Sequence, residues 1–190
     1  MVSFFLRLFL KDKKTCKPAM RQYMIAESVN LCLWSVTIRL YGITAEAGLV
    51  CLLLSALLVL GIVDAKVREI PGVLNLFILL LAVWHTALHA GQRFTYILGF
   101  FCLSSVLTLV YWLRRGHGIG GGDIKLVAAA GMFLGWERSL WAFLTAGIAA
   151  CLINAPWLKQ RKTGAEFAFG PFLATGIVVV VWFFAPPVTG

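Results

Sequence analysis

Charged residues are scarce in this sequence: Asp, Glu, Lys and Arg make up 13% of its 190 residues, whereas 61% are hydrophobic. Soluble domains usually carry about 25% charged residues. The hydrophobic residues also stand in long runs without a charge, which excludes an ordinary soluble domain and predicts an all-α fold, a polytopic membrane helical bundle. No internal repeat or low-complexity segment interrupts these runs, so one compact helical domain is the simplest organisation.

Clustered cysteines are lacking as well. The 5 cysteines are scattered and form no CxxC pair, so neither a disulfide framework nor a cysteine zinc site is indicated. His85 and His89 have the i,i+4 spacing of a metal pair, but no third ligand is visible beside them. We therefore predict no metal and no cofactor. Residues 1–10 are apolar but contain Arg7 and lead to no small-residue cleavage site, so a removable signal peptide is not expected.

Seven apolar segments are predicted to cross the membrane: residues 23–41, 47–63, 73–88, 94–113, 124–136, 140–157 and 172–184. The first is weak, because it carries Glu27, Asn30 and Arg39, and it is either an interior-facing span or an interfacial helix. The segment after Asp123 is shorter than the ~20 residues of a full crossing, so residues of the preceding glycine loop are expected to extend it. Pro71 is expected in the first turn of its helix. The chain is divided into a basic amino-terminal segment with the weak span, residues 1–44, and a core of six spans, residues 45–190.

The net charge of +9 lies in short clusters between the apolar segments, so it indicates membrane topology rather than a nucleic-acid partner. Of the 17 Lys and Arg residues, all but Arg39, Arg93 and Arg138 fall on one side if every segment crosses. Because cytoplasmic connections are rich in Lys and Arg, this side is predicted to be cytoplasmic. Membrane lipid is the expected surrounding partner, and the sequence leaves the oligomeric state open.

Asp123 is an acid at the edge of an apolar segment, directly after Gly120, Gly121 and Gly122. A charge beside hydrocarbon costs roughly 2.5–3.5 kcal/mol or more, so an acid in this position is a functional-site hypothesis by default. Glycine allows close approach of another chain, which suits the entry of a peptide. The alternative is a glycine-rich turn in which Asp123 is a helix N-cap.

Asp64 ends segment 47–63 on the same predicted side of the membrane, so Asp64 and Asp123 could meet. Two carboxylates a few ångströms apart share a proton: one deprotonates a water molecule while the other protonates a carbonyl group. This is aspartic peptidase chemistry. Paired acids inside a membrane also form proton relays, so a proton-coupled membrane transporter is the alternative function. The position of both acids near one face, away from the midplane, favours the peptidase.

Three segments carry a resemblance to a known family: Gly120 to Leu126, Asp64-xxx-Arg68-x-Ile70-Pro71, and Phe169 to Ala174. In this order they resemble the type IV prepilin peptidases. The glycine–aspartate motif alone is also similar to presenilin and signal peptide peptidases, but the two flanking segments favour the prepilin enzymes. The resemblance implies Asp64 and Asp123 as the catalytic pair. It also implies cleavage of the basic leader of type IV prepilins or type II secretion pseudopilins at the cytoplasmic face of the bacterial inner membrane.

Longer members of that family carry an amino-terminal region with paired CxxC zinc ligands and a methyltransferase activity on the new amino terminus. Here only Cys16 lies in that region, and Met24 and Leu31 replace a proline and a glycine of the family pattern. The resemblance therefore predicts a short form, a peptidase that cleaves without efficient methyl transfer.

Other residues near the motifs are weaker candidates. The glycine loop and the segment before the last span are expected to bind substrate or shape the site, through Gly120, Gly121, Gly122, Lys125, Gly170 and Pro171. Lys125 either orients the substrate or is an interfacial lysine that reaches toward water. Glu69 and Glu166 lie in connections, where they either meet a basic leader or are ordinary solvated charges.

Overall fold

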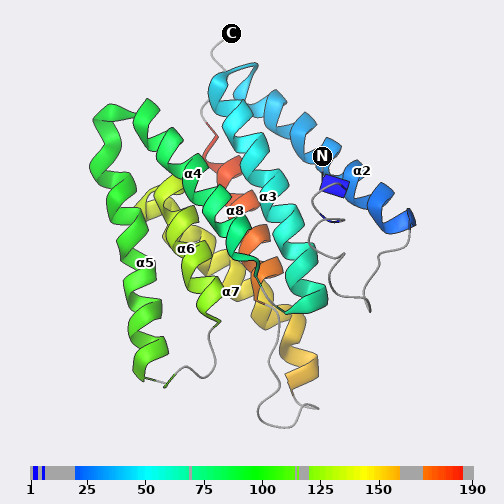
Figure 1. Cartoon of the computed structure of the whole chain (residues 1–190), viewed down its shortest axis with the longest axis vertical. Helices are drawn as coiled ribbons and strands as arrows, with labels where there is room; N and C mark the ends of the chain where they lie inside the picture. Colours follow the sequence, from blue (N-terminus) through cyan, green and yellow to red (C-terminus); the bar gives the residue numbers. More distant parts are fainter. Residues whose placement is uncertain are drawn as a thin grey trace.

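The computed structural model describes residues 2, 3, 6, 20–68, 70–113, 115, 120–158 and 169–185, with the side chains of 154–158 left aside. Within this part of the chain the fold is all-helical, which confirms the all-α part of the predicted class (Figure 1). The elements are α2 (Met20–Tyr41), α3 (Ala45–Val67), α4 (Gly72–Leu88), the 3-10 turn η1 (Ala90–Gln92), α5 (Arg93–Leu113), α6 (Gly121–Leu134), α7 (Trp136–Leu158) and α8 (Gly170–Phe183).

These helices match the predicted segments closely. Helix α6 begins at Gly121, so glycine-loop residues do extend it, as expected. The prediction for Pro71 is wrong by a small margin. Pro71 is the N-cap of α4, with the extended angles φ −61° and ψ 123°, and the helix itself begins at Gly72. A proline ring fixes φ near this value without requiring a helical ψ, so the residue suits either place.

Successive helices run in opposite directions, which gives the bundle two ends (Figure 1). The end of α3 and the starts of α4, α6 and α8 lie at the lower end in that view. The start of α3 and the ends of α4 and α6 lie at the upper end. Residues far apart in sequence, such as Asp64 and Asp123, are thereby brought to the same end.

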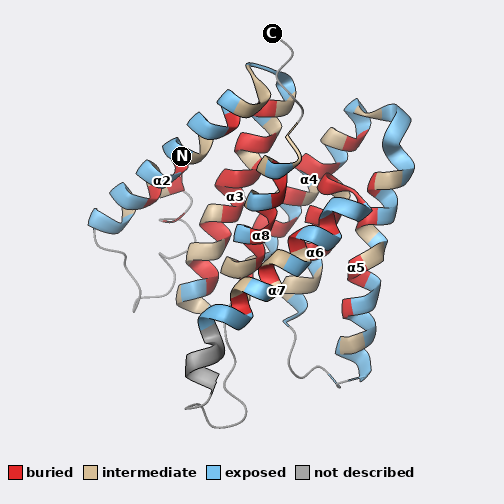
Figure 2. Ribbon diagram, turned by 180° about the vertical axis from the view of Figure 1, so that it is seen from behind, coloured by how far each residue is buried: buried red, intermediate tan, exposed pale blue. Residues whose placement is uncertain are grey.

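Helix α3 is the central element. Its side chains Leu53, Leu54, Leu57 and Leu60 are each 0% exposed. Helix α5 differs, because large apolar side chains such as Phe94, Phe101 and Leu109 are exposed on it (Figure 2). Among the described residues, two stretches, Ala45–Val67 and Ala90–Leu113, are long and apolar enough to cross a membrane. An apolar outer surface of this kind is what lipid would cover.

Helix α2 faces the bundle with its polar side chains. Asn30 and Thr37 are buried. Ser55 on α3 donates a hydrogen bond from Oγ to Asn30 Oδ1 at 2.8 Å. The Trp182 ring on α8 donates from Nε1 to Thr37 Oγ1 at 3.1 Å. Since these polar groups are paired inside the protein, the contacts favour the interior-facing reading of α2 over the interfacial one.

Small residues let several helices approach closely. Gly99 on α5 and Gly131 on α6 face each other, and a Cβ atom built on either would collide with the carbonyl oxygen of the other. Gly176 on α8 likewise packs on the carbonyl oxygen of Ala142 on α7. Helices in membranes often associate through such small residues, because lipid removes the hydrophobic drive for association and leaves van der Waals packing.

Candidate active site

Asp64 lies in the last turn of α3, and it is 5% exposed. Its Oδ2 atom accepts a hydrogen bond of 3.0 Å from the backbone N–H of Gly170, at the start of α8. The helix ends at Arg68, whose N–H bonds to the carbonyl oxygen of Asp64 and whose φ of 55° is left-handed. A non-glycine residue in this region is uncommon and is often found close to functional sites. The position of the carboxylate is therefore fixed by α3, which carries Asp64, and by the start of α8, which donates the hydrogen bond.

Gly170 and Pro171 shape the surroundings of Asp64. A Cβ atom on residue 170 would lie 2.6 Å from Asp64 Oδ2, so only glycine fits without a shift. Pro171 follows within the first turn of α8, where its missing N–H costs no helical hydrogen bond. Its Cα lies 3.6 Å from a Cβ built on Gly61, one turn before Asp64. The structure thus places both predicted site-shaping residues against the end of α3.

Asp123 lies in the first turn of α6, and the N-cap is Gly120. The alternative in which Asp123 is itself the N-cap is therefore wrong. The Asp123 N–H bonds to the carbonyl oxygen of Gly120 at 3.0 Å. Its Oδ1 atom is buried and has no hydrogen-bond partner within the described part of the chain. Leaving a buried carboxylate oxygen unpaired is costly, so this atom is suited to meeting a water molecule or a substrate group.

The connection between α3 and α4 holds the start of α6. A Cβ atom on Gly122 would lie 2.8 Å from the Cβ of Ile70, which requires glycine at position 122. The Asn75 side chain on α4 donates a hydrogen bond from Nδ2 to the carbonyl oxygen of Gly122 at 3.1 Å. Contact with the first turn of α6 thus explains why an isoleucine–proline pair and a glycine motif, far apart in sequence, belong to one site.

These contacts bring the two acids together. Asp64 and Asp123 lie at the same end of the bundle, where Ile70, six residues after Asp64, packs against Gly122, the residue before Asp123. Asp64 is anchored by the Gly170 N–H, whereas Asp123 keeps one oxygen unpaired. Such a pair can share a proton and pass it between a water molecule and a carbonyl group.

The remaining predicted site residues differ in how many contacts they make with the rest of the protein. Gly120 is near Asp123, since a Cβ atom there would lie 3.2 Å from Asp123 Oδ2. Gly121 is exposed and has open space around it. Lys125 is exposed as well, and no contact assigns it a role. Glu69 and Glu166 lie outside the described residues.

Asn75 is a site residue that the sequence did not indicate. It is buried, and its Oδ1 atom has no hydrogen-bond partner among the described residues. The available signal was a single amide in the first turn of a helix whose next nine residues are all apolar. Polar groups in such positions are usually paired, so this amide could have been expected to bond to a neighbouring element.

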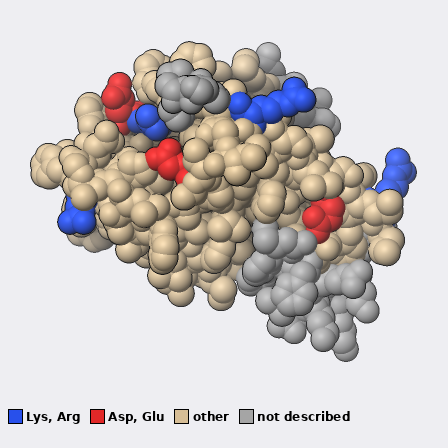
Figure 3. Space-filling model, turned by 90° about the horizontal axis from the view of Figure 1, so that it is seen from above, with Lys and Arg blue, Asp and Glu red and all other residues tan. Residues whose placement is uncertain are grey.

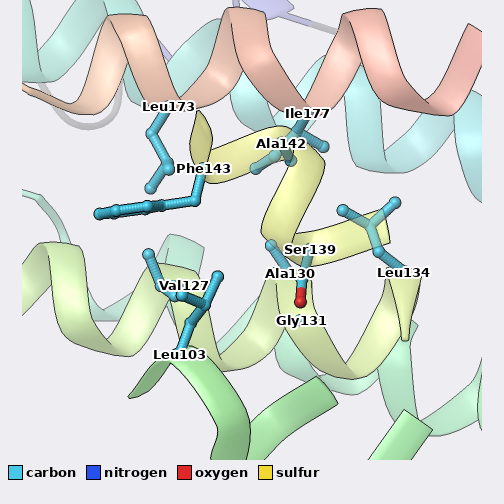
Figure 4. A pocket seen from close by; sticks show the side chains of 10 residues that line it. All are labelled: Leu103, Val127, Ala130, Gly131, Leu134, Ser139, Ala142, Phe143, Leu173 and Ile177. Carbon is cyan, nitrogen blue, oxygen red and sulfur yellow. The ribbon is translucent and has the colours of Figure 1, made fainter. Parts of the chain in front are cut away.

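A small apolar cavity lies farther inside the bundle. Figure 4 shows side chains from four helices around it, including Leu103 on α5, Val127 on α6, Phe143 on α7 and Ile177 on α8. It has room for about one water molecule and offers almost no polar surface. We therefore do not regard it as a substrate site.

Comparison with known proteins identifies the family. The profile of the Type IV leader peptidase family matches residues 51–155, which is more than half of the chain. The chain therefore belongs to the type IV leader peptidase family, as its three motifs indicated. No solved structure matches the chain.

Several relatives share the name prepilin leader peptidase/N-methyltransferase. The protein of that name from Pseudomonas aeruginosa is 29% identical over 177 residues, which cover 88% of this chain and 61% of the relative. The one from Burkholderia pseudomallei (strain K96243) is 31% identical over 176 residues, covering 89% of this chain and 57% of the relative. The one from Bacillus subtilis is 26% identical over 178 residues, covering 90% and 71%. The chain thus spans about three fifths of the length of the first two.

Proposed function

We propose that the protein is an intramembrane aspartic endopeptidase that removes the basic leader peptide of type IV prepilins or type II secretion pseudopilins. The observation that carries this proposal is the position of two acids, Asp64 in the last turn of α3 and Asp123 in the first turn of α6, at the same end of an apolar bundle. Family membership supports the reaction class. The name shared by the relatives supports the substrate class.

Asp64 and Asp123 act as a unit in this proposal. One carboxylate takes a proton from the attacking water, and the other gives a proton to the carbonyl oxygen of the scissile peptide. Because the two groups titrate together, neither has a protonation state of its own. The Gly170 N–H orients Asp64, and the unpaired Oδ1 of Asp123 is available to the water or the substrate.

The substrate is proposed to enter beside the glycine segment. Gly120 and Gly121 are exposed at the start of α6, and a Cβ atom on Gly121 would meet nothing within 4 Å. The absence of side chains there lets the backbone of a peptide lie next to Asp123. Lys125, one turn farther along, is exposed on the same helix and is a candidate for orienting the peptide.

The site is proposed to face the cytoplasm from the bacterial inner membrane. Lys66, Arg68 and Lys125 lie on the helix ends that carry the two aspartates, whereas Arg39, Arg93 and Arg138 lie on the opposite ends. This asymmetry supports the orientation that the positive-inside rule predicts. Six core spans and a weaker first span, α2, remain our proposal for the crossings, with residues 1–44 and 45–190 as the two parts of the chain.

Family membership favours the peptidase over the proton-coupled transporter, since the matched profile is that of a leader peptidase family.

Whether the protein also transfers a methyl group is a separate question. The relatives' names include an N-methyltransferase. Cys16, on which the expectation of inefficient methylation partly rests, lies outside the described residues. That expectation stays a prediction.

Mass spectrometry of a prepilin co-expressed with this protein tests the proposed function, because it reports the cleavage position and methylation together. We expect a mature amino terminus at the end of the basic leader. A matched variant with Glu137→Gln, which alters an exposed acid in the first turn of α7, should process the prepilin as the unchanged protein does. An intact leader with the unchanged protein present in the membrane would contradict the proposal.

A further inference from the structure

Three potential metal ligands meet at the end of the bundle opposite to the aspartates. Glu46 lies in the first turn of α3, His85 in the last turn of α4, and His89 is the C-cap of α4. One ligand atom from each lies within 4.8 Å of the others. The third ligand that the histidine pair lacked in the sequence is thus supplied by a glutamate 39 residues before His85.

The His89 ring is oriented as a metal-ligating imidazole is. Its Nδ1 atom lies 3.0 Å from the carbonyl oxygen of His85, which accepts a hydrogen bond when that nitrogen carries the proton. Its Nε2 atom then presents a lone pair toward Glu46 Oε1, with which it makes a close contact. A backbone carbonyl bonded to one ring nitrogen fixes the tautomer that leaves the other nitrogen free for a metal.

The His85 ring is held rigidly and has an unpaired nitrogen. It stacks on Phe133 of α6 at a centroid distance of 4.4 Å and contacts the edge of Tyr96 of α5 at 5.1 Å. Its Nδ1 atom is buried without a hydrogen-bond partner among the described residues. A metal ion bound at the cluster would give the ring a partner, and an unpaired buried nitrogen otherwise costs free energy.

We propose that Glu46, His85 and His89 bind a divalent transition-metal ion of the zinc type. Two imidazoles and one carboxylate form a ligand set found in zinc proteins, and a water molecule completes four-coordination. Calcium and magnesium prefer oxygen ligands alone, so this donor set disfavours both. The Glu46 and His89 side chains are 37% and 28% exposed, which leaves a path for the ion and the water.

The proposed ion would link the start of α3, through Glu46, to the end of α4, through His85 and His89. Figure 3 looks onto this end of the molecule, where both acidic and basic side chains reach the surface among residues of neither charge. Arg138 lies in the first turn of α7 at the same end of the bundle, so its positive charge would repel a bound cation. The site does not involve Asp64 or Asp123, so its failure would leave the proposed peptidase activity untouched.

Metal titration of the detergent-purified protein tests this site. For this experiment the protein is expressed without a histidine tag, and a chelator first removes any bound metal. Zn²⁺ or Co²⁺ is then added in separate titrations. We expect one equivalent of zinc by elemental analysis and visible d–d absorption on Co²⁺ binding without thiolate charge-transfer bands. Each of Glu46→Gln, His85→Asn and His89→Asn should weaken binding at least 10-fold, as expected when one of three protein ligands is lost.

Matched controls separate a metal site from general damage. His117→Asn changes the third histidine of the chain and Glu137→Gln changes an acid at the same end, and both should bind as the unchanged protein does. Arg138→Gln should tighten binding several-fold, because it removes a repulsive charge. Helical circular dichroism and a single elution peak would show that each variant is folded. The proposal is overturned if the unchanged protein binds less than about one equivalent of zinc or cobalt. It is also overturned if each of the three single variants binds the ion as tightly as the unchanged protein does.

Discussion

The backbone N–H of Gly170 donates a hydrogen bond to Asp64 Oδ2 at 3.0 Å, across 106 residues of sequence. A side chain at position 170 would collide with the same oxygen. The start of α8 therefore fixes the carboxylate at the end of α3. The donor of this hydrogen bond is a backbone group, so any residue except proline could supply it. Glycine is needed at position 170 because a larger residue leaves no room for the Asp64 carboxylate.

The first prediction concerns this contact. Gly170→Ala places a Cβ atom 2.6 Å from Asp64 Oδ2, so either the carboxylate or α8 must shift. We expect prepilin cleavage to fall at least 10-fold, since displacing a catalytic group by about 1 Å can cost 100-fold. The control is Gly147→Ala on α7, away from the aspartates, where nothing lies within 4 Å of the new methyl group. Equal activity of the two variants in a purified cleavage assay would count against the contact.

The second prediction concerns Asn75, which we regard as a positioning residue. Asn75→Leu keeps a similar volume but removes the hydrogen bond to the carbonyl oxygen of Gly122. The substitution removes a buried amide oxygen that has no partner, which offsets the lost hydrogen bond, so thermal stability should change little. Cleavage should nevertheless fall about 3- to 10-fold, in keeping with the loss of about 1 kcal/mol of hydrogen bonding. A parallel loss of stability and activity would instead indicate a purely structural role.

The third prediction concerns helix packing away from the site. Gly99→Ala places a methyl group against the backbone of Gly131, so α5 and α6 must separate. Such overpacking typically costs about 1–3 kcal/mol. The melting temperature in detergent should fall, and Gly147→Ala, which meets nothing within 4 Å on α7, should leave it unchanged or raise it. A fall of the same size in both variants would show that the close approach is unimportant.

The fourth prediction concerns topology. In a cysteine-free background, Lys66→Cys at the end of α3 should resist a membrane-impermeant thiol reagent in intact cells, while Arg93→Cys at the start of α5 reacts. The reason is the concentration of Lys and Arg on the aspartate side. Both cysteines should react once the membrane is permeabilised. Labelling of residue 66 from outside would reverse the orientation.

The sequence predicted the helices well because long apolar runs between charges leave few alternatives in a membrane protein. Asp64 and Asp123 were proposed as site residues for a related reason, since each is an acid at the edge of such a run. Their partners were harder to predict. The Gly170 N–H reaches Asp64 only through the packing of α8 on α3, and no periodicity in the sequence records that contact.

Two local expectations show the limit of reasoning from residue preferences. Asp123 has a side chain typical of an N-cap, yet Gly120 occupies that position, because the helix begins within the glycine segment. No pattern in the sequence marks Glu46 as a metal ligand, because its approach to His85 and His89 depends on how α3 and α4 pack at the end opposite to the aspartates. Both outcomes were decided by contacts between distant segments.

The most direct test of the account is cleavage of a purified prepilin by the purified protein and by its Asp64→Asn and Asp123→Asn variants. Each amide is similar in size to the acid but cannot take part in the shared-proton cycle. We predict that each variant is folded, that each retains less than about one thousandth of the cleavage rate, and that the double variant is no worse than either single one, because the groups act as a unit. Substantial cleavage by either single variant would remove that aspartate from the catalytic pair and contradict the account.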